Sequence, residues 1–405
     1  MKIIHINAVN TIASTGRIAY EMDAFFHERG AAHVVAYAQG ESANPDREFV
    51  IGSPIDRKLH GLLSRISGKQ GYFSHAATRR LLKFMDKYRP DVAVLGNLHG
   101  NYIHLPMLLR YLAKKDIATV VILHDCWFYT GKCCHYTVEG CYRWQDACGH
   151  CPQLKKYNKS WFFDRTSAML RDKRALFQSI PRLAVVGVSD WLVGEAKRAP
   201  VFQNAKIFKR IYNWVDTAVF SPRDTAALRE ELGLSGKKII LAVASSWGRE
   251  KGIDTVLEIA RRLGEDERLV LVGDSGHIEP CEQILRLPAT HSVDRLAEYY
   301  SAADVFLQPS LEETFGKVTA EALACGTPAV CFASTANPEL VGDGCGAAVP
   351  PGDIAGMLSE IRKILAAGKE PYRESCRNFA QSNFEKEHNL EAYAELFKTI
   401  AGDSV

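Results

Sequence analysis

Apolar and polar residues follow one another along this chain in blocks that predict strands and helices in turn. Short apolar runs have the length of buried strands, and longer segments with apolar residues every three or four positions are typical of helices. In the first half we expect strands at 3–7, 33–37, 91–95, 118–123 and 183–188, with helices at 16–29, 102–114 and 190–198. This alternation predicts parallel sheets covered by helices on both faces.

The second half repeats the pattern. Here the expected strands are 238–244, 269–272, 284–287, 304–308 and 329–332, the expected helices are 251–263, 293–302 and 318–324, and the tail 354–400 is mainly helical. A chain of 405 residues is long enough for two domains, each with its own core. We therefore predict an α/β protein with two doubly wound, Rossmann-like domains facing across a cleft, one over 1–205 and one over 206–384.

Composition narrows the class of protein. A hydrophobic content of 47% and a charged content of 24% are ordinary for a globular protein. The net charge of +3 is too small to indicate nucleic acid as a partner. No apolar run approaches the roughly 18 to 20 residues that span a bilayer. The N-terminus reads as a strand rather than a secretion signal, which predicts a cytoplasmic protein.

The most informative segment joins the strand at 304–308 to the helix that follows it. Glu313 lies in the connecting loop and Glu321 lies inside the helix. The backbone N–H groups of the loop and the positive end of the helix favour a pyrophosphate, and they belong to Thr314, Phe315, Gly316 and Lys317. A carboxylate accepts hydrogen bonds from adjacent hydroxyls, so Glu321 suits a ribose and Glu313 a hexose. The same spacing also fits an ordinary βαβ unit with two solvent-facing glutamates.

Polar residues follow several other predicted strands, where doubly wound sheets bind their ligands. Such clusters stand at 7–16, 97–101, 124–125, 245–252, 273–274 and 312–313. Three fall in each half of the chain, as an active site between two domains requires.

The segment around Glu313 and Glu321 resembles the E-x7-E signature of the retaining, nucleotide-sugar-dependent glycosyltransferases of family 4, which have the GT-B fold. The resemblance implies that Glu313 approaches the donor sugar and that Glu321 holds the ribose. It also implies that the last helix, 385–405, packs back onto the first domain. No catalytic metal is expected for such an enzyme.

The same resemblance extends to further residues. Lys251 matches the lysine of the family's G-R-x4-K-G motif, whose arginine column falls on Ser246, so Arg249 is the substitute cation. His124 matches a histidine near the donor sugar, and Gly16 a glycine whose backbone meets the phosphate or the acceptor. The remaining expected contacts are Gly273, Arg286 and Leu287 on the donor side and Asn97 and His99 on the acceptor side. Two of these residues also have a purely structural interpretation. Arg249 fits an ordinary surface cation, and His124 fits a buried histidine that is satisfied by the backbone.

Cysteines cluster after the strand at 118–123, in an expected insertion at 126–152. Cys148 and Cys151 form a C-x2-C knuckle, and Cys134 and Cys141 precede it. Four soft ligands in a short segment of a cytosolic chain predict a structural zinc ion that holds an irregular insertion in shape. Cys133 in place of Cys134, a contribution from His135 or His150, disulfides and free thiols remain open. The insertion also resembles a subgroup of bacterial polysaccharide glycosyltransferases.

Together these features predict a retaining glycosyltransferase that moves a sugar from a UDP- or GDP-sugar to a saccharide or lipid-linked acceptor in surface polysaccharide biosynthesis. A sugar-nucleotide epimerase, a trehalose-type synthase and a non-catalytic sugar-binding partner of a transferase are the alternatives. The basic stretch 57–89 holds nine Lys or Arg residues and one acid. It fits a solvated helical face, and it also fits peripheral contact with the inner face of the cell membrane.

Overall fold

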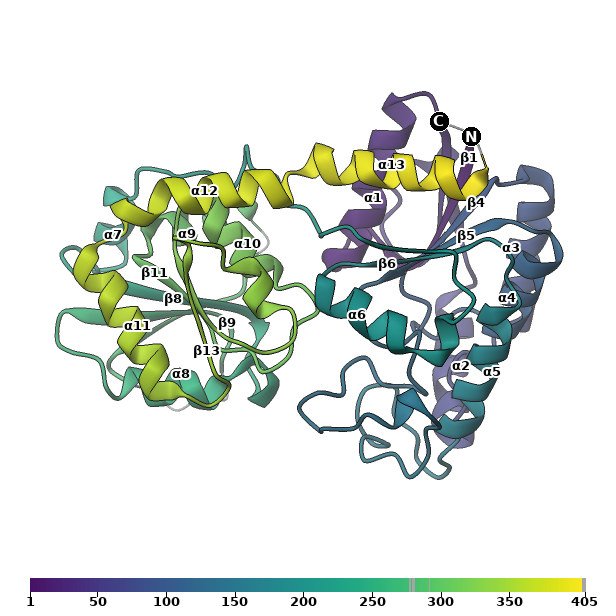
Figure 1. The fold of residues 1–405 in the computed structure, drawn as a ribbon, viewed down its shortest axis with the longest axis horizontal. Coiled ribbons are helices and arrows are strands. Elements are labelled where there is room, and N and C mark those ends of the chain that lie inside the picture. Colours follow the sequence, from purple (N-terminus) through teal and green to yellow (C-terminus); the bar gives the residue numbers. More distant parts are fainter. Residues whose placement is uncertain (277, 279–280, 291, 403–405) are drawn as a thin grey trace. The chain divides into compact units, whose positions relative to one another are not determined.

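The computed structural model describes residues 1–276, 278, 281–290 and 292–402. Contacts divide the chain into two compact units, unit 1 with Met1–Ile211 and the residues from Leu390 on, and unit 2 with Tyr212–Asn389. Each unit is built around one parallel sheet, as Figure 1 shows. The two α/β units with parallel sheets confirm the predicted fold class.

Unit 1 contains a seven-stranded sheet in the order β3-β2-β1-β4-β5-β6-β7. Its strands are β1 (Lys2–Asn10), β2 (Ala32–Gly40), β3 (Glu48–Val50), β4 (Val92–Leu95), β5 (Ala118–Leu123), β6 (Leu183–Gly187) and β7 (Ile207–Arg210). Its helices are α1 (Ala13–Glu28), α2 (Pro54–Ser67), α3 (His75–Tyr88), α4 (Leu105–Lys114), α5 (Thr166–Gln178), α6 (Asp190–Arg198) and, for the most part, α13 (Lys386–Ala401). Three short 3-10 turns are η1 (Pro45–Arg47), η2 (Arg143–Gln145) and η3 (Pro200–Phe202).

Unit 2 contains a six-stranded sheet in the order β10-β9-β8-β11-β12-β13. Its strands are β8 (Lys238–Ser246), β9 (Glu267–Asp274), β10 (Ile284–Leu287), β11 (Val305–Gln308), β12 (Ala329–Phe332) and β13 (Gly346–Val349). Its helices are α7 (Ala226–Glu231), α8 (Ile253–Ala260), α9 (Val293–Ala302), α10 (Lys317–Ala324), α11 (Ile354–Ala367) and α12 (Glu370–Phe384), with 3-10 turns η4 (Arg249–Lys251) and η5 (Asn337–Leu340).

The central strands carry the cores because they are covered on both faces. Every residue of β4, β5, β11 and β12 is buried, which is why these strands read as unbroken apolar runs rather than alternating ones. The C-terminal helix α13 adds to the core of unit 1, where Phe397 stacks on Phe26 with ring centroids 5.3 Å apart. Arg182 also donates a hydrogen bond to the carbonyl of Ala401 over 2.9 Å.

Most predicted elements form, and the differences have local causes. Helix α1 begins at Ala13 rather than 16 because Thr11 and Ala13 adopt left-handed backbone, with φ of 63° and 55°, and turn the chain at once into the helix. The predicted helix 251–263 is divided into η4 and the shorter α8, which Gly252 separates. The basic stretch 57–89 lies largely in α2 and α3.

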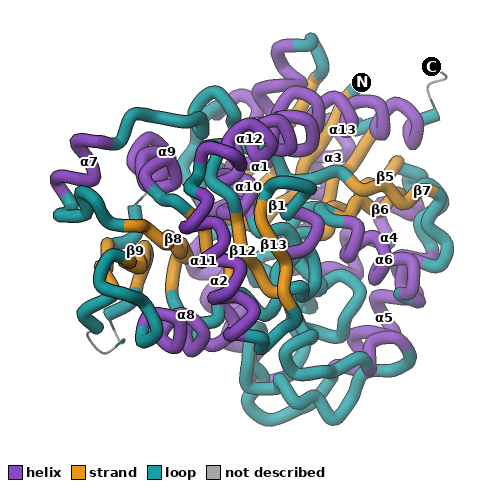
Figure 2. The backbone as a smooth tube through the Cα atoms, turned by 60° about the vertical axis from the view of Figure 1, so that its left-hand side comes forward, coloured by secondary structure: helices purple, strands orange, loops and turns teal. Residues whose placement is uncertain are grey.

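One connection departs from this regular pattern. Between β5 and α5, residues 124–165 contain η2 as their only helical turn and no strand, and Figure 2 shows the backbone around α5 and α6 dominated by loop. Over the part of the chain that is described, every helix is too short or too polar to cross a lipid bilayer.

The order of the strands identifies where each sheet can bind a ligand. In unit 1 the direction of winding reverses between β1 and β4, and in unit 2 it reverses between β8 and β11. At such a point, the connections that follow two neighbouring strands run to opposite faces of the sheet. This leaves a crevice at the carboxyl ends of the two strands. The loops after β1 and β4, and those after β8 and β11, therefore occupy the two switch points.

Candidate active site

An ion pair joins the two loops at the switch point of unit 2. Lys251, the last residue of η4, places its Nζ 2.5 Å from Oε1 of Glu313 in the loop after β11. The Glu313 side chain is 15% exposed and that of Lys251 is 39% exposed, so the carboxylate is shielded while the ammonium remains accessible to solvent and ligands. The backbone also joins the loops, since the N–H of Leu311 donates to the carbonyl of Glu250 over 2.9 Å.

Gly252 allows this close approach. Its φ of 74° lies in the left-handed region, and a Cβ at this position would stand 2.1 Å from the carbonyl oxygen of Pro309. Any side chain would push the loop after β8 away from the loop after β11. The glycine that follows Lys251 is thus a condition for the Lys251–Glu313 pair.

Helix α10 starts beside Glu313. Gly316 is its N-cap residue, with φ of 93°, and Lys317 is its first residue. The first N–H groups of a helix have no acceptor inside it, and the helix dipole makes this end positive. The N–H of Glu313 donates to Oγ1 of Thr335 over 2.8 Å, which steadies the loop.

Phe315 has a structural side chain. It is 3% exposed, and its ring lies 5.8 Å from that of Tyr212 and 5.5 Å from that of Phe384. Packing of this ring holds the loop that contains Thr314 against the body of unit 2, and it leaves only the Phe315 backbone for a ligand.

Glu321 lies on the inner side of α10 and is 8% exposed. Its Oε2 accepts a hydrogen bond of 3.0 Å from the hydroxyl of Tyr300, at the end of α9. Burial, together with the nearby Glu321 charge, holds the pKa of Tyr300 well above its ordinary value. Tyr300 therefore remains a hydrogen-bond donor that orients the Glu321 carboxylate.

The other residues predicted on the donor side lie along the same edge. Ser246 is the last residue of β8, and Arg249 is exposed on η4, two positions before Lys251. Gly273, near the end of β9, has φ of 125°, and a Cβ there would lie 1.8 Å from the carbonyl oxygen of Ala244. The side chain of Arg286 donates to the carbonyl of Ile278 over 2.8 Å, and Leu287 ends β10.

The switch point of unit 1 is organised by Asn7. Its Oδ1 accepts a hydrogen bond of 2.8 Å from the N–H of Asn97, and its Nδ2 donates to the carbonyls of Val9 and Thr15. Asn7 thus ties the loop after β4 to the turn before Gly16. A Cβ on Gly16 would stand 3.1 Å from the carbonyl carbon of Asn10, so this turn has little room for a side chain.

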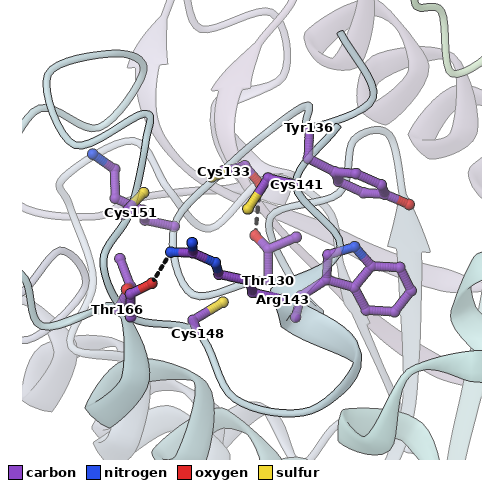
Figure 3. Close-up of a pocket in the computed structure, with 11 residues that line it drawn as sticks. Thr130, Cys133, Tyr136, Cys141, Arg143, Cys148, Cys151 and Thr166 are labelled. Atoms are coloured by element: carbon purple, nitrogen blue, oxygen red, sulfur yellow. Dashed lines mark hydrogen bonds between the residues drawn. The ribbon is translucent and has the colours of Figure 1, made fainter. Parts of the chain in front are cut away.

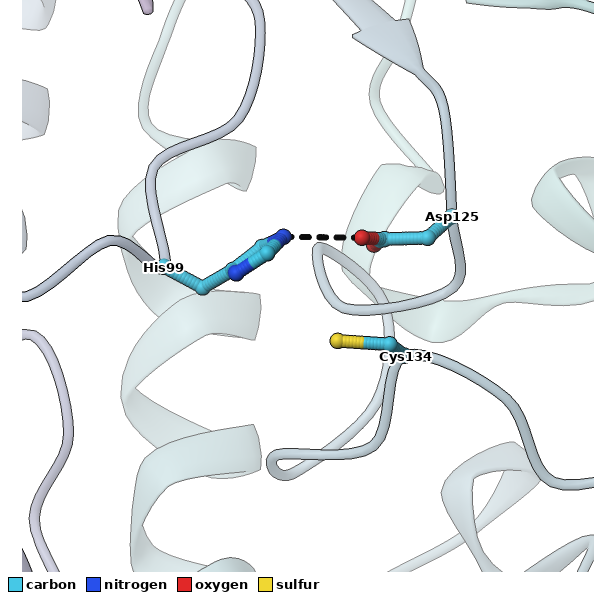
Figure 4. A group of neighbouring side chains, drawn as sticks. All are labelled: His99, Asp125 and Cys134. Atoms are coloured by element: carbon cyan, nitrogen blue, oxygen red, sulfur yellow. Dashed lines mark hydrogen bonds and ion pairs between the residues drawn. The ribbon is translucent and has the colours of Figure 1, made fainter. Parts of the chain in front are cut away.

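His99 is paired with Asp125, as Figure 4 shows. Nε2 of His99 lies 2.8 Å from Oδ2 of Asp125. The other carboxylate oxygen, Oδ1, accepts a hydrogen bond from the backbone N–H of Trp127. Burial alone would raise the pKa of Asp125, but the charge and hydrogen bond of His99 lower it to about 2. The neighbouring His124 has its pKa lowered to about 4 by burial, so its imidazole is neutral at neutral pH.

The cysteines of the insertion separate into two groups. Cys133, Cys141, Cys148 and Cys151 line one pocket (Figure 3). Cys134 lies elsewhere, beside His99 and Asp125. Its Sγ, a ring nitrogen of His99 and a carboxylate oxygen of Asp125 all lie within 4.8 Å of one another. Cys133 thus lines this pocket in place of Cys134, the exchange that the sequence left open, because consecutive residues of the loop point to different sides. The zinc set of Cys134, Cys141, Cys148 and Cys151 stays a prediction.

Sequence reasoning missed several residues that shape these edges. Asn7 and Asp125 belong to the polar clusters that follow predicted strands, so the signal was present but the two side chains were not singled out. Trp247, 3% exposed, donates from its indole to the carbonyl of Val272 over 3.0 Å and ties the loop after β8 to β9. Nothing in the local sequence distinguishes Trp247 or Tyr300 from ordinary core aromatics.

Comparison with known proteins places these features in a context. Residues 237–367 match the family model described as glycosyl transferases group 1. A D-inositol 3-phosphate glycosyltransferase of Mycolicibacterium vanbaalenii is 31% identical over 209 residues, which cover 45% of this chain and 45% of that protein. The chain thus spans about half the length of the curated relative that it matches.

Solved structures extend the similarity to the whole chain. Sucrose-phosphate synthase of Thermosynechococcus elongatus has a TM-score of 0.71 at 17% identity, covering 100% of both chains. Anabaena HepE in complex with UDP-glucose has a TM-score of 0.65 at 16% identity, covering 98% of this chain and 100% of that one. At this level of identity the likeness shows the fold, which is the GT-B fold of glycosyltransferases.

Proposed function

We propose that this protein is a retaining glycosyltransferase that transfers a sugar from a UDP- or GDP-sugar to a saccharide or lipid-linked acceptor of surface polysaccharide synthesis. The observation that carries the proposal is the Lys251–Glu313 pair beside the N-terminus of α10, at the switch point of the unit 2 sheet. It lies inside the range 237–367 that matches the group 1 glycosyl transferase model. Anabaena HepE, which has a similar structure, has been solved in complex with UDP and with UDP-glucose.

The positive end of α10 and the Lys251 ammonium suit a diphosphate. In the transfer, the bond between the anomeric carbon and the phosphate oxygen breaks, and a bond from the acceptor oxygen to that carbon forms. The proton of the acceptor hydroxyl ends on the departing diphosphate. Lys251, assisted by Arg249, stabilises the negative charge that grows on the leaving group.

The two glutamates then have separate tasks. Glu313 lies at the mouth of the loop, where it can accept hydrogen bonds from hydroxyls of the donor sugar and hold the sugar for attack. Glu321, held by Tyr300, is oriented to accept from the two ribose hydroxyls. Backbone around Arg286 and Leu287 is the proposed contact of the base, and backbone contacts of this kind suit uracil and guanine alike.

Residues of unit 1 complete the proposal on the acceptor side. Asn97 and His99 follow β4 and are held in place by Asn7 and Asp125. A neutral His124 can donate one hydrogen bond and accept another, which suits a sugar hydroxyl. The turn at Gly16 leaves backbone open to a phosphate or to the acceptor.

A transfer assay with a panel of UDP- and GDP-sugars tests the proposal. Glu313→Gln should lower kcat/KM by about 100-fold or more, because an amide cannot hold the sugar hydroxyls as a carboxylate does. Glu370→Gln is the matched control, since Glu370 is 67% exposed in a surface ion pair with Arg373. Wild-type turnover by Glu313→Gln would contradict the proposal, and conversion of the donor without an acceptor would indicate an epimerase. Since Lys251 and Arg249 supply the positive charge, transfer should not need added Mg²⁺.

A surface of unit 1 supports a lipid-linked acceptor. Helix α2 exposes a stripe formed by Ile55 (77%), Leu59 (54%), Leu62 (44%) and Ile66 (40%), spaced to lie on one face. The end of α2 meets a second exposed apolar segment, Trp161–Phe163, because the N–H of Trp161 donates to the carbonyl of Arg65 over 2.7 Å. Exposed cations surround both segments, namely Lys58, Arg65, Lys155, Lys159 and Arg165.

A polar pocket of about 360 Å³ lies between α2 and the second segment, and its lining includes Arg65, Asn101, Lys159 and Trp161. Two cations, an amide and an aromatic ring suit a phosphate that carries a sugar. We propose that the apolar surface rests on an anionic bilayer and that the pocket takes the head group of the acceptor.

Sedimentation with vesicles tests the membrane contact. Vesicles with about one third anionic lipid should bind the wild-type protein, and the double change Ile55→Asp with Phe162→Asp should weaken that binding at least about tenfold. Tyr20→Asp on α1 is the control, because Tyr20 is 39% exposed outside this surface. Equal binding by all three proteins, or equal binding to neutral vesicles, would contradict the membrane contact without affecting the test of transfer.

A further inference from the structure

Four cysteines of the insertion converge although they come from separate turns. Cys133 follows the buried segment after β5, Cys141 precedes η2, and Cys148 and Cys151 flank a tight knuckle. Figure 3 shows their side chains around one pocket. The sulfurs of Cys133 and Cys151 are close enough to hydrogen-bond with each other. A small pocket lined by four thiols suits a single soft metal ion better than an organic ligand.

The knuckle is shaped as a metal-binding turn would require. Gly149 and His150 both have positive φ, 139° and 47°, so the chain reverses sharply between Cys148 and Cys151. The guanidinium of Arg143 donates to the carbonyls of both Gly149 and His150, which holds this strained turn in place. A non-glycine residue in left-handed backbone, here His150, is strained, and a ligand bound by the two flanking thiols would offset that strain.

Buried positive charge supplies a second, independent observation. Lys132 and Lys173 are each 2% exposed. Their ammonium groups donate to backbone carbonyls, those of Gln153 and Leu154 for Lys132 and those of Trp127 and Thr130 for Lys173. Lys132 also lines the pocket of the four cysteines. A zinc ion with four thiolates carries a net charge of −2, which would offset two buried ammonium groups.

The insertion has little regular secondary structure to hold it in shape. Over residues 124–165 the structure has one short 3-10 turn and no strand. Buried aromatic side chains hold its inner side, namely Trp127, Phe128, Tyr129, Tyr136 and Trp144. Irregular segments of this length commonly depend on a metal or on disulfides as well. A metal at the four cysteines would connect the start, the middle and the end of the insertion at one point.

The other candidate set is less suitable. His99, Asp125 and Cys134 make up this second set. In the described part of the chain it is the only set of three or more His, Cys, Asp or Glu residues whose ligand atoms all lie within 4.8 Å of one another. Asp125 is already paired with His99 and also accepts the backbone N–H of Trp127, and this set offers only one sulfur. The four thiols stand farther apart, so metal binding would draw the irregular loops inward.

We infer that Cys133, Cys141, Cys148 and Cys151 bind one zinc ion as a four-thiolate structural site that holds the insertion together. Each thiol releases its proton to solvent on binding, and no oxidation is involved. The ion has no open position for a substrate, so its role is to fix the loops that follow His124 and Asp125. This site does not depend on the proposed transferase activity.

The adjacent cysteines provide a matched pair of variants. Protein purified without chelators should contain about one zinc per chain by elemental analysis. Cys133→Ser should lose most of that zinc, whereas Cys134→Ser should retain it. Replacement of zinc by Co²⁺ should produce the intense thiolate-to-cobalt absorption of a tetrahedral thiolate site in wild type and in Cys134→Ser. Equal zinc loss in the two variants would overturn the ligand set.

Wild-type protein gives a test that does not depend on the folding of a variant. Alkylation with iodoacetamide, followed by peptide mass spectrometry, should find the four cysteines protected until zinc is removed with a chelator, while Cys281 reacts in both states. Protein that has no zinc as purified and takes up none from added Zn²⁺ would overturn the inference. A disulfide among the four cysteines, seen as two missing hydrogens in the intact mass, would overturn it as well.

Discussion

Two connections between a strand and the next helix, one in each unit, are held in shape by different means. The connection from β11 to α10, residues 309–316, is short and fixed by backbone. Gly252 lies against Pro309, Leu311 is bonded to Glu250, and Phe315 is packed among rings. The connection from β5 to α5, residues 124–165, is long and is organised by side chains, among which are four convergent thiols.

The difference teaches where each connection can fail. A short loop between two buried elements inherits its shape from the sheet, so only steric changes at a few positions disturb it. A long irregular loop loses conformational entropy at every residue, and here the compensating apolar burial is concentrated in a few aromatic side chains such as Trp127, Tyr136 and Trp144. Its shape then depends on a few strong cross-links, and removing one of them should release a whole segment.

The largest expected effect follows from metal removal. Removal of zinc from the proposed four-thiolate site should increase amide hydrogen exchange over 133–151 by about 100-fold or more, because local unfolding would no longer have to break the metal bonds. Exchange in β11 and α10 should stay unchanged. Mass spectrometry of peptic peptides measures both regions in one experiment. Uniform loosening of the whole chain would show that the insertion is not an independent unit of stability.

A glycine pair tests the short connection. Gly252→Ala places a Cβ 2.1 Å from the Pro309 carbonyl oxygen, whereas Gly236→Ala has φ of 75° and no atom within 4 Å of its Cβ. Both changes have the cost of left-handed backbone, about 1 kcal/mol, and only Gly252→Ala also separates the two loops. We expect it to lower the free energy of unfolding by about 3 kcal/mol in total and to weaken UDP-sugar binding. Urea unfolding and calorimetry check this, and equal effects of the two changes would contradict it.

The most gradual expected effect, spread over more than two pH units, concerns α2, a regular helix that borders the insertion. The N–H of Gly71 donates to Nε2 of His60 over 3.2 Å, and Nδ1 of His60 lies 2.7 Å from the Ser74 hydroxyl, so the ring must be neutral. Burial, and then the charge of His104, lowers the pKa of His60 to about 4 from 6.5. The unfolded chain therefore binds more protons between these values. Stability is complete above pH 6.5 and is lost as pH falls toward 4, by at most about 1.4 kcal/mol per pH unit from this residue.

His60→Gln removes this contribution to the pH dependence. Chemical unfolding of wild type and variant at a series of pH values from 7.5 to about 4 should show a smaller loss of stability in the variant. Parallel curves would show that His60 does not titrate between the folded and unfolded states.

The alternation of apolar runs was enough to locate most of the framework. Elements α6, α9, β10 and β12 have the bounds that the pattern predicts, because each is a contiguous segment whose period and end signals are local. The polar residues at strand ends also pointed to Lys251, Glu313 and Gly316. These positions follow from a general property of parallel sheets, in which the carboxyl ends of neighbouring strands lie at one edge.

The tertiary structure alone decided which neighbours in the sequence become neighbours in space. Cys133 and Cys134 are consecutive, yet one lines the thiol pocket and the other lies beside His99 and Asp125. The end of α2 and Trp161 are joined by a backbone hydrogen bond although they are distant in the chain. Periodicity does not reveal such contacts, because an irregular loop has no repeat and the direction of each side chain depends on the packing around it.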